Sequence, residues 1–140
     1  MSTSVAKSGA KPKPSRNTRY RRGANIEYRA KAALQSQGYL VIRAAGSHGP
    51  ADLVALRPAH DSWKRQTGPE VLLVQCKRSK NRLTPGEKSE LAWIADRLGC
   101  SAVLVASRLE AIKATGGRRL VLDWFEVRSD GTMAVMHGEG

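Results

Sequence analysis

The chain has 140 residues, 41% of them hydrophobic, which is typical of one domain with one core. Twenty-four Lys and Arg residues oppose twelve Asp and Glu residues, and the net charge of +12 indicates a polyanionic partner, either nucleic acid or an anionic membrane surface. No stretch approaches the roughly 20 apolar residues of a membrane span, and no apolar run follows the N-terminal charges. We therefore expect a soluble, cytoplasmic protein without a signal peptide.

The N-terminal segment differs in composition from the rest. Residues 1–22 carry seven cations and no acid, in a stretch rich in Ser, Gly and Pro. We expect residues 1–20 to form a basic, disordered tail and residues 21–140 to form the folded domain. The tail is either a solubilising leader or an arm that binds phosphates. The remainder still holds seventeen cations against twelve acids, so the folded part is basic too.

Hydrophobic periodicity predicts the elements of an α/β domain. Ile26, Ala30 and Leu34 recur at helical spacing, and Gly38 is a helix stop, so residues 24–37 are predicted to be helical. Thr84-Pro85-Gly86-Glu87 is a capping box with Pro at the first helical position, and it begins a helix that ends near Gly99. Strands are expected at 39–45, 51–57, 70–78, 101–107 and 120–127, with an edge piece at 132–136.

The central strands are apolar on both faces, which predicts a mixed β-sheet with helices on both sides. Core packing is the default for Trp93, which lies on the predicted helix 84–98, and a contact between subunits is the alternative. The two cysteines lack zinc-site spacing and are expected to be reduced thiols of the core.

One strand ends in polar side chains that point the same way. Along VLLVQCKRSK (71–80) side chains alternate, so Gln75 and Lys77 share a face while Cys76 takes the other. Asp52 begins the preceding strand, just after the turn 46–50, and a hairpin-like neighbour would place it beside this strand end. A carboxylate, an amide oxygen and an ammonium then converge. A plain salt bridge between Asp52 and Lys77 is the simpler interpretation.

Glu27 favours a metal site over that simpler interpretation. It lies next to Ile26 on the first helix and is predicted to point towards the edge of the sheet. Mg²⁺ prefers oxygen ligands and usually keeps several waters, and Asp52, Gln75 and Glu27 supply such oxygens. Lys77 would then orient or deprotonate the attacking water, or offset charge on a phosphate in the transition state.

These residues resemble a known motif. Pro50-Ala51-Asp52 followed by Gln75-Cys76-Lys77 is similar to the PD-(D/E)xK nuclease motif, which is short and promiscuous by itself. A more specific likeness runs from Arg21-Arg22-Gly23-Ala24-Asn25-Ile26-Glu27 through Val41-Ile42-Arg43-Ala44-Ala45-Gly46-Ser47 to Asp52-Leu53-Val54-Ala55. Over roughly residues 20–100 the chain resembles the archaeal-type Holliday junction resolvases.

The resemblance implies a fold, an activity and a site. The fold would be restriction-endonuclease-like, and the activity would be Mg²⁺- or Mn²⁺-dependent paired nicking of four-way DNA junctions by a homodimer. It implies that Glu27, Ser47, Asp52 and Lys77 form the active site together with the motif position Gln75. It also implies DNA contacts at Arg43 and at the neighbouring pair Arg21 and Arg22, to which the tail residue Arg19 is added. Arg78, Lys80 and Arg82 follow the presumed metal site and are interpreted as phosphate contacts.

Two positions depart from the family pattern. Tyr28 stands where the family usually has Arg, and Gln75 replaces the motif acid, which removes one ligand charge. A Gln variant of the motif occurs in related nucleases, and the sequence leaves open whether Gln75 is natural or an inactivating substitution. The alternatives are a related nuclease acting on another DNA substrate and a basic DNA-binding module whose catalytic centre has decayed.

Overall fold

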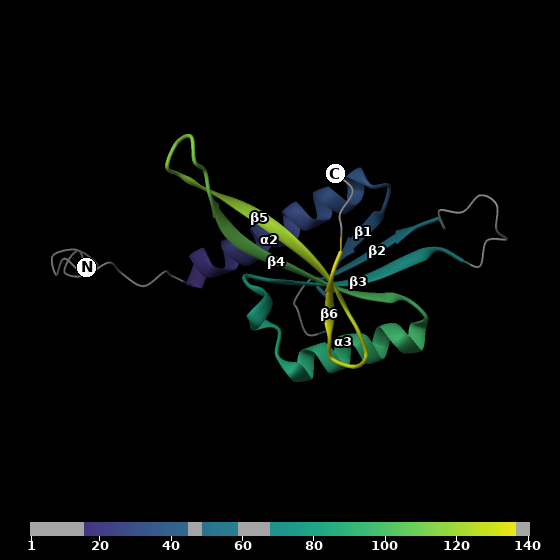
Figure 1. Cartoon of the computed structure of the whole chain (residues 1–140). Helices are drawn as coiled ribbons and strands as arrows, with labels where there is room; N and C mark the ends of the chain where they lie inside the picture. The colour runs from purple at the N-terminus through teal and green to yellow at the C-terminus, as the bar shows by residue number, and fades with distance from the viewer. Residues whose placement is uncertain (1–15, 45–48, 59–67, 137–140) are drawn as a thin grey trace.

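The computed structural model describes residues 16–44, 49–58 and 68–136, with the backbone alone for residues 16–24. Its elements are, in chain order, α2 (Arg16–Ser36), β1 (Leu40–Arg43), β2 (Leu53–Arg57), β3 (Glu70–Lys77), the 3-10 helix η1 (Lys80–Arg82), α3 (Pro85–Leu98), β4 (Ser101–Ala111), β5 (Arg118–Val127) and β6 (Met133–Val135). Figure 1 shows them arranged around one sheet.

The six strands lie side by side in sequence order. β1, β2 and β3 are antiparallel neighbours, and so are β4, β5 and β6. β3 and β4 run parallel. The connection between them contains α3, which returns the chain to the end of the sheet at which β3 begins. The start of β2 and the end of β3 therefore lie at the same end of the sheet.

The two helices cover opposite faces of this sheet (Figure 1). Leu34 of α2 packs with Leu53, Val74 and Val103 in one core layer. The other layer joins residues of α3 to the opposite faces of the same central strands, and its fully buried leucines are Leu91 and Leu104. The prediction of an α/β domain with a mixed sheet between helices is thus confirmed.

The ends of α3 follow the predicted capping pattern. The Thr84 hydroxyl accepts a hydrogen bond from the Glu87 N–H at 3.2 Å, and the Glu87 carboxylate accepts one from the Thr84 N–H at 3.1 Å. Gly99 ends the helix with φ 69° and ψ 31°, a left-handed conformation that glycine adopts without a Cβ clash.

The first helix is longer than predicted. α2 begins at Arg16, eight residues before the expected start at 24, and it ends at Ser36 just before Gly38, which has φ 91°. Residues 16–20 of the predicted tail therefore belong to the helix, and residues 1–15 lie outside the described residues. Arginine has a good helix propensity, and four arginines precede Gly23 in this helix.

Core packing of Trp93 was a wrong expectation, because its side chain is 59% exposed. The buried stripe of α3 consists of Leu91, Ala92 and Ala95, which leaves Trp93 on the outer side with the Arg97 guanidinium 4.8 Å from its ring centroid. Among the described residues no helix is long and apolar enough to span a membrane.

Candidate active site

Asp52 lies at the start of β2 and is fixed to the backbone of β3. Its N–H donates to the Val74 carbonyl at 2.8 Å, and its Oδ2 accepts a hydrogen bond from the Cys76 N–H at 2.8 Å. The residue is only 6% exposed. A buried carboxylate is thereby held against the stretch of β3 between Gln75 and Lys77.

The surroundings of Asp52 favour its neutral form. Burial raises the pKa of Asp52, the hydrogen bond from Cys76 opposes this rise, and the charge of Glu27 adds to it. Lys77 lowers the same pKa and Glu87 raises it, so both also lie within electrostatic range of Asp52. Three acids and one lysine therefore share one end of the sheet.

Glu27 reaches this cluster from the α2 side of the sheet. Its Oε2 accepts a hydrogen bond from Arg43 Nε at 2.7 Å, and its side chain is 13% exposed. Arg43 ends β1, and its guanidinium lies 6.0 Å from the ring centroid of Tyr28. Glu27 was predicted to point towards the edge of the sheet. It does contact Arg43, which ends the edge strand β1.

Lys77 reaches the cluster from the α3 side. Its Nζ donates to Glu87 Oε2 at 2.8 Å, and this hydrogen bond is the largest cause of the lowered pKa of Glu87. The simpler interpretation paired Lys77 with Asp52, whereas the direct partner in the structure is Glu87. The sequence signalled Glu87 only as a helix cap, and nothing local in it indicates a partner on β3.

Gln75 and Cys76 take opposite faces of β3, as the alternation predicted. Cys76 packs against the α2 layer, while Gln75 follows Leu73 on the α3 side and is half-buried. Burial raises the pKa of the free Cys76 thiol, and the nearby charges of Asp52 and Glu27 raise it further. The thiol is therefore neutral and unsuited to act as a nucleophile.

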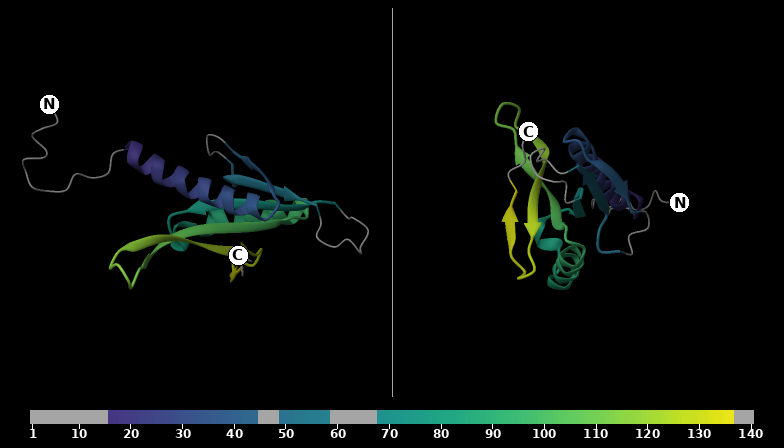
Figure 2. Two further views of the ribbon diagram at one scale, coloured as in Figure 1. Left: turned by 90° about the horizontal axis from the view of Figure 1, so that it is seen from above. Right: turned by 90° about the vertical axis from the view of Figure 1, so that its right-hand side faces the viewer.

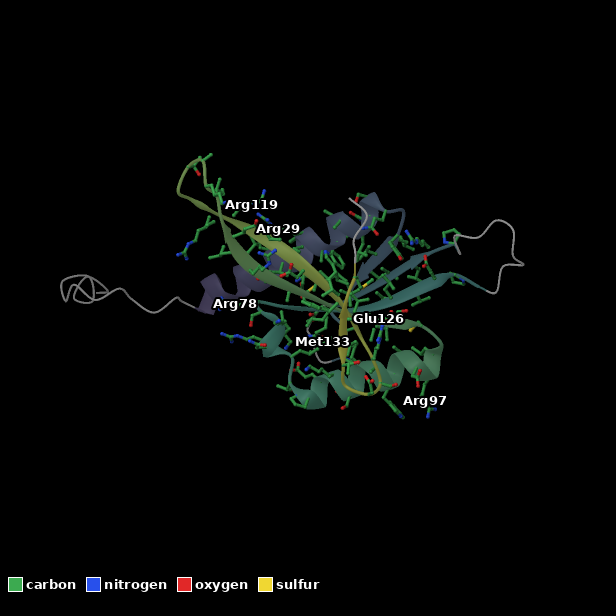
Figure 3. The ribbon with its side chains drawn as sticks, viewed as in Figure 1. Arg29, Arg78, Arg97, Arg119, Glu126 and Met133 are labelled. Atoms are coloured by element: carbon green, nitrogen blue, oxygen red, sulfur yellow. The ribbon has the colours of Figure 1, made fainter. Side chains whose placement is uncertain are left out.

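The predicted phosphate contacts follow directly after β3. Arg78 is half-buried, its carbonyl accepts a hydrogen bond from the Ser107 hydroxyl at 2.9 Å, and its buried Nη2 has no hydrogen-bond partner among the described residues. Lys80 and Arg82 are exposed on η1. Figure 3 shows Arg78 in the same half of the molecule as Arg29 and Arg119, far from Arg97 at the end of α3.

Four other predicted site residues are placed only by their backbone or not at all. Ser47 lies outside the described residues. Arg19, Arg21 and Arg22 lie in the first half of α2, where the backbone alone is described. Their roles stay predictions.

The donor atoms of this cluster suit a hard cation. Within the described ranges no group of three His, Cys, Asp or Glu side chains is placed to hold a metal. Glu27 nevertheless lies close enough to Asp52 for its negative charge to raise the pKa of Asp52. Two carboxylates, an amide oxygen and water are a donor set that Mg²⁺ accepts. The hydrogen bond from Arg43 to Glu27 would have to yield for Glu27 to take part.

No family model matches the sequence. Among solved structures, the chain is similar to Hjc of Archaeoglobus fulgidus, a Holliday junction resolvase from an archaeal hyperthermophile. The identity is 21%, the match covers 76% of this chain and 73% of the other, and the TM-score is 0.47.

Proposed function

We propose that the protein is a metal-dependent, structure-selective endonuclease that resolves four-way DNA junctions by paired nicks, in DNA recombination and repair. One observation carries the proposal: the buried carboxylate of Asp52 is held at the end of β3, between Gln75 and Lys77. This arrangement brings together in space the motif residues that the sequence separates by more than twenty positions. The +12 net charge supports a polyanionic substrate.

Each residue of the cluster has a role in this proposal. Asp52, Gln75 and Glu27 would hold Mg²⁺, with Mn²⁺ as a substitute, and the bound ion would polarise the phosphate and lower the pKa of a water. Lys77 donates a hydrogen bond to a phosphate oxygen, where negative charge develops in the transition state. Glu87 positions the Lys77 ammonium before DNA binds, through their 2.8 Å contact.

The DNA backbone would follow the basic residues around this end of the sheet. Arg78 follows directly after β3, and its guanidinium, whose buried Nη2 has no hydrogen-bond partner among the described residues, would have to turn outward to contact a phosphate oxygen. Lys80 and Arg82 extend the positive surface on η1, and they are exposed. The arginines at the start of α2 and Arg43 complete the proposed contact set.

Paired nicks across a junction require two active sites related by a two-fold axis, so we propose a homodimer. Apolar side chains on the edge strand β1 support association. Leu40 is 67% exposed and Ile42 is 54% exposed, on the face of the sheet that α3 leaves open beside β1. Neighbouring apolar side chains exposed in this way are typical of protein contacts.

The direct test compares two substrates of the same sequence. A four-way junction and a linear duplex are incubated with the protein and Mg²⁺, and nicked product is quantified on denaturing gels. The proposal predicts faster nicking of the junction, with symmetric incisions in opposing strands. Equal nicking of both substrates would indicate a general nuclease of the same motif.

Two observations favour a second candidate, a DNA-binding module without catalysis. Gln75 brings no charge to the metal site, and Lys77 already has a carboxylate partner in Glu87. Such a module binds the junction and nicks no DNA at any Mg²⁺ concentration.

A further inference from the structure

β4 and β5 continue past the candidate active site as a two-stranded ribbon. The last pair between β3 and β4 joins Lys77 to Ala106, whereas β4 and β5 stay paired as far as Ala111 and Arg118. The ribbon therefore begins where β3 ends. Figures 1 and 2 show it projecting from the sheet in the same direction as the N-terminal end of α2.

The ribbon is an ordered extension with a closed tip. The Ile112 N–H donates to the Gly117 carbonyl at 2.8 Å, and the Gly116 N–H donates to the Ile112 carbonyl at 2.9 Å. Gly116 has φ 71°, a conformation that suits glycine in the turn. Arg29 of α2 donates to the Leu120 carbonyl at 3.5 Å, which links the base of the ribbon to the helix.

The charge of this ribbon, residues 108–119, is strongly positive. Its only acid is Glu110, and its cations are Arg108, Lys113, Arg118 and Arg119. Arg108 pairs with Asp123 at 2.7 Å and Arg119 pairs with Glu110 at 3.5 Å. Within the described part of the chain, Lys113 and Arg118 have no ion-pair partner, and both are exposed.

We infer that the ribbon is a DNA-contacting arm that binds the phosphate backbone of a duplex leading away from the cleaved strand. This inference rests on the proposed function, because it places the arm beside a phosphodiester held at Asp52 and Lys77. The major groove of DNA admits a two-stranded β-ribbon, and Lys and Arg side chains bind its phosphates. Lys113 and Arg118, the two cations near the tip, are the proposed contacts.

Charge on exposed strands also has a structural use, since cations on a free edge prevent pairing with other chains. The two roles differ in their salt dependence. A phosphate contact releases counterions, so its loss flattens the dependence of log K on log salt by about 0.9. A cation that only protects an edge leaves this slope unchanged.

The experiment compares two double variants of the full chain with equal net charge. Lys113→Ala with Arg118→Ala removes the tip cations, while Arg97→Ala with Arg128→Ala removes two cations at the opposite end of β4 and β5. Junction affinity is measured by fluorescence anisotropy between 50 and 300 mM salt, roughly the range in which phosphate contacts are resolved. The tip variant is expected to bind about tenfold more weakly, with a slope lower by about 1.8, and the control is expected to stay near wild type.

The outcomes separate the arm from the proposed function. If wild type nicks the junction and the two double variants bind it equally well, the arm is overturned and the proposed function stands. If wild type neither binds nor nicks any DNA, both fall. If the tip variant loses the dimer in analytical ultracentrifugation while the control keeps it, the ribbon is a subunit contact, and the arm is overturned. Nicking at saturating DNA is expected to be unchanged in the control variant.

Discussion

The burial of the Asp52 carboxylate carries a cost in stability. Its raised pKa means that the folded state binds the Asp52 proton more tightly than the unfolded state does. The resulting stability contribution is present below the unfolded pKa near 3.8 and is lost as the pH rises through the higher folded pKa. At neutral pH the ionised carboxylate therefore destabilises the metal-free fold.

Replacement of Asp52 by Asn should make the metal-free protein more stable at neutral pH. An Asn side chain accepts the hydrogen bond from Cys76 through its Oδ1 and carries no charge into the buried site. The melting temperatures of wild type and Asp52→Asn are measured in EDTA from pH 4 to pH 8. The difference in favour of the variant should increase as the pH rises. A variant that is less stable than wild type at pH 8 would contradict this account of the site.

At the scale of single elements, α3 depends on its cap and also positions Lys77. Thr84→Ala removes the hydroxyl that accepts the Glu87 N–H, and it should destabilise the protein by about 1 kcal/mol. Lys77 contacts Glu87 Oε2, whereas the cap uses the Glu87 N–H and Oε1. Nicking at a temperature well below melting should therefore stay near the wild-type rate. Urea unfolding and nicking assays on the same preparation test both statements. Loss of nicking in parallel with stability would show that the cap and the site are not separable.

Because α2 begins at Arg16, a truncation that tests the basic tail should end at residue 15. Removal of residues 1–15 leaves the helix intact and deletes three lysines, Lys7, Lys11 and Lys13. If the tail contacts DNA, the log–log salt slope of junction binding should flatten by up to about 2.7, at 0.9 per contact. An unchanged slope would show that the tail serves only as a leader. Replacement of the three lysines by Gln in the full-length chain is the matched control for chain length.

The sequence predicted best what is local. The capping box at Thr84 and the stop at Gly99 act through hydrogen bonds within a few residues, and both are where the pattern placed them. The alternation of Gln75 and Cys76 also follows from the period of a strand. These features need no knowledge of the tertiary fold.

The remaining features depend on contacts between distant segments. The pairing of Lys77 with Glu87 arises because the cap of α3 packs beside the end of β3, and no residue pattern announces it. The ribbon was missed because residues 108–119 are polar and charged, which resembles a loop in sequence. Trp93 was misassigned because the apolar stripe of α3 is narrow and made of small residues beside Leu91.

At the scale of the whole molecule, the proposed reaction requires two copies of the site. We predict a C₂ homodimer at micromolar concentration, measured by equilibrium sedimentation. Ile42→Lys places a charge on the exposed apolar face of β1 and should weaken a dimer that uses this face, whereas Gln35→Lys, at an exposed position of α2, is the control with the same added charge. A wild-type monomer that still cuts both strands in one binding event would rule out the dimer.

The central claim is that Asp52, Gln75, Glu27 and Lys77 form a metal-dependent catalytic centre, and a Mg²⁺ titration of junction nicking tests it most directly. Asp52→Asn and Lys77→Ala should abolish nicking while junction binding stays nearly intact, because affinity comes mainly from the basic surface. Gln75→Glu adds a ligand charge and should keep or raise activity with a lower Mg²⁺ requirement. Arg97→Ala, at the far end of α3, is the control and should match wild type. Mg²⁺-dependent nicking that persists in both Asp52→Asn and Lys77→Ala would contradict the assigned site.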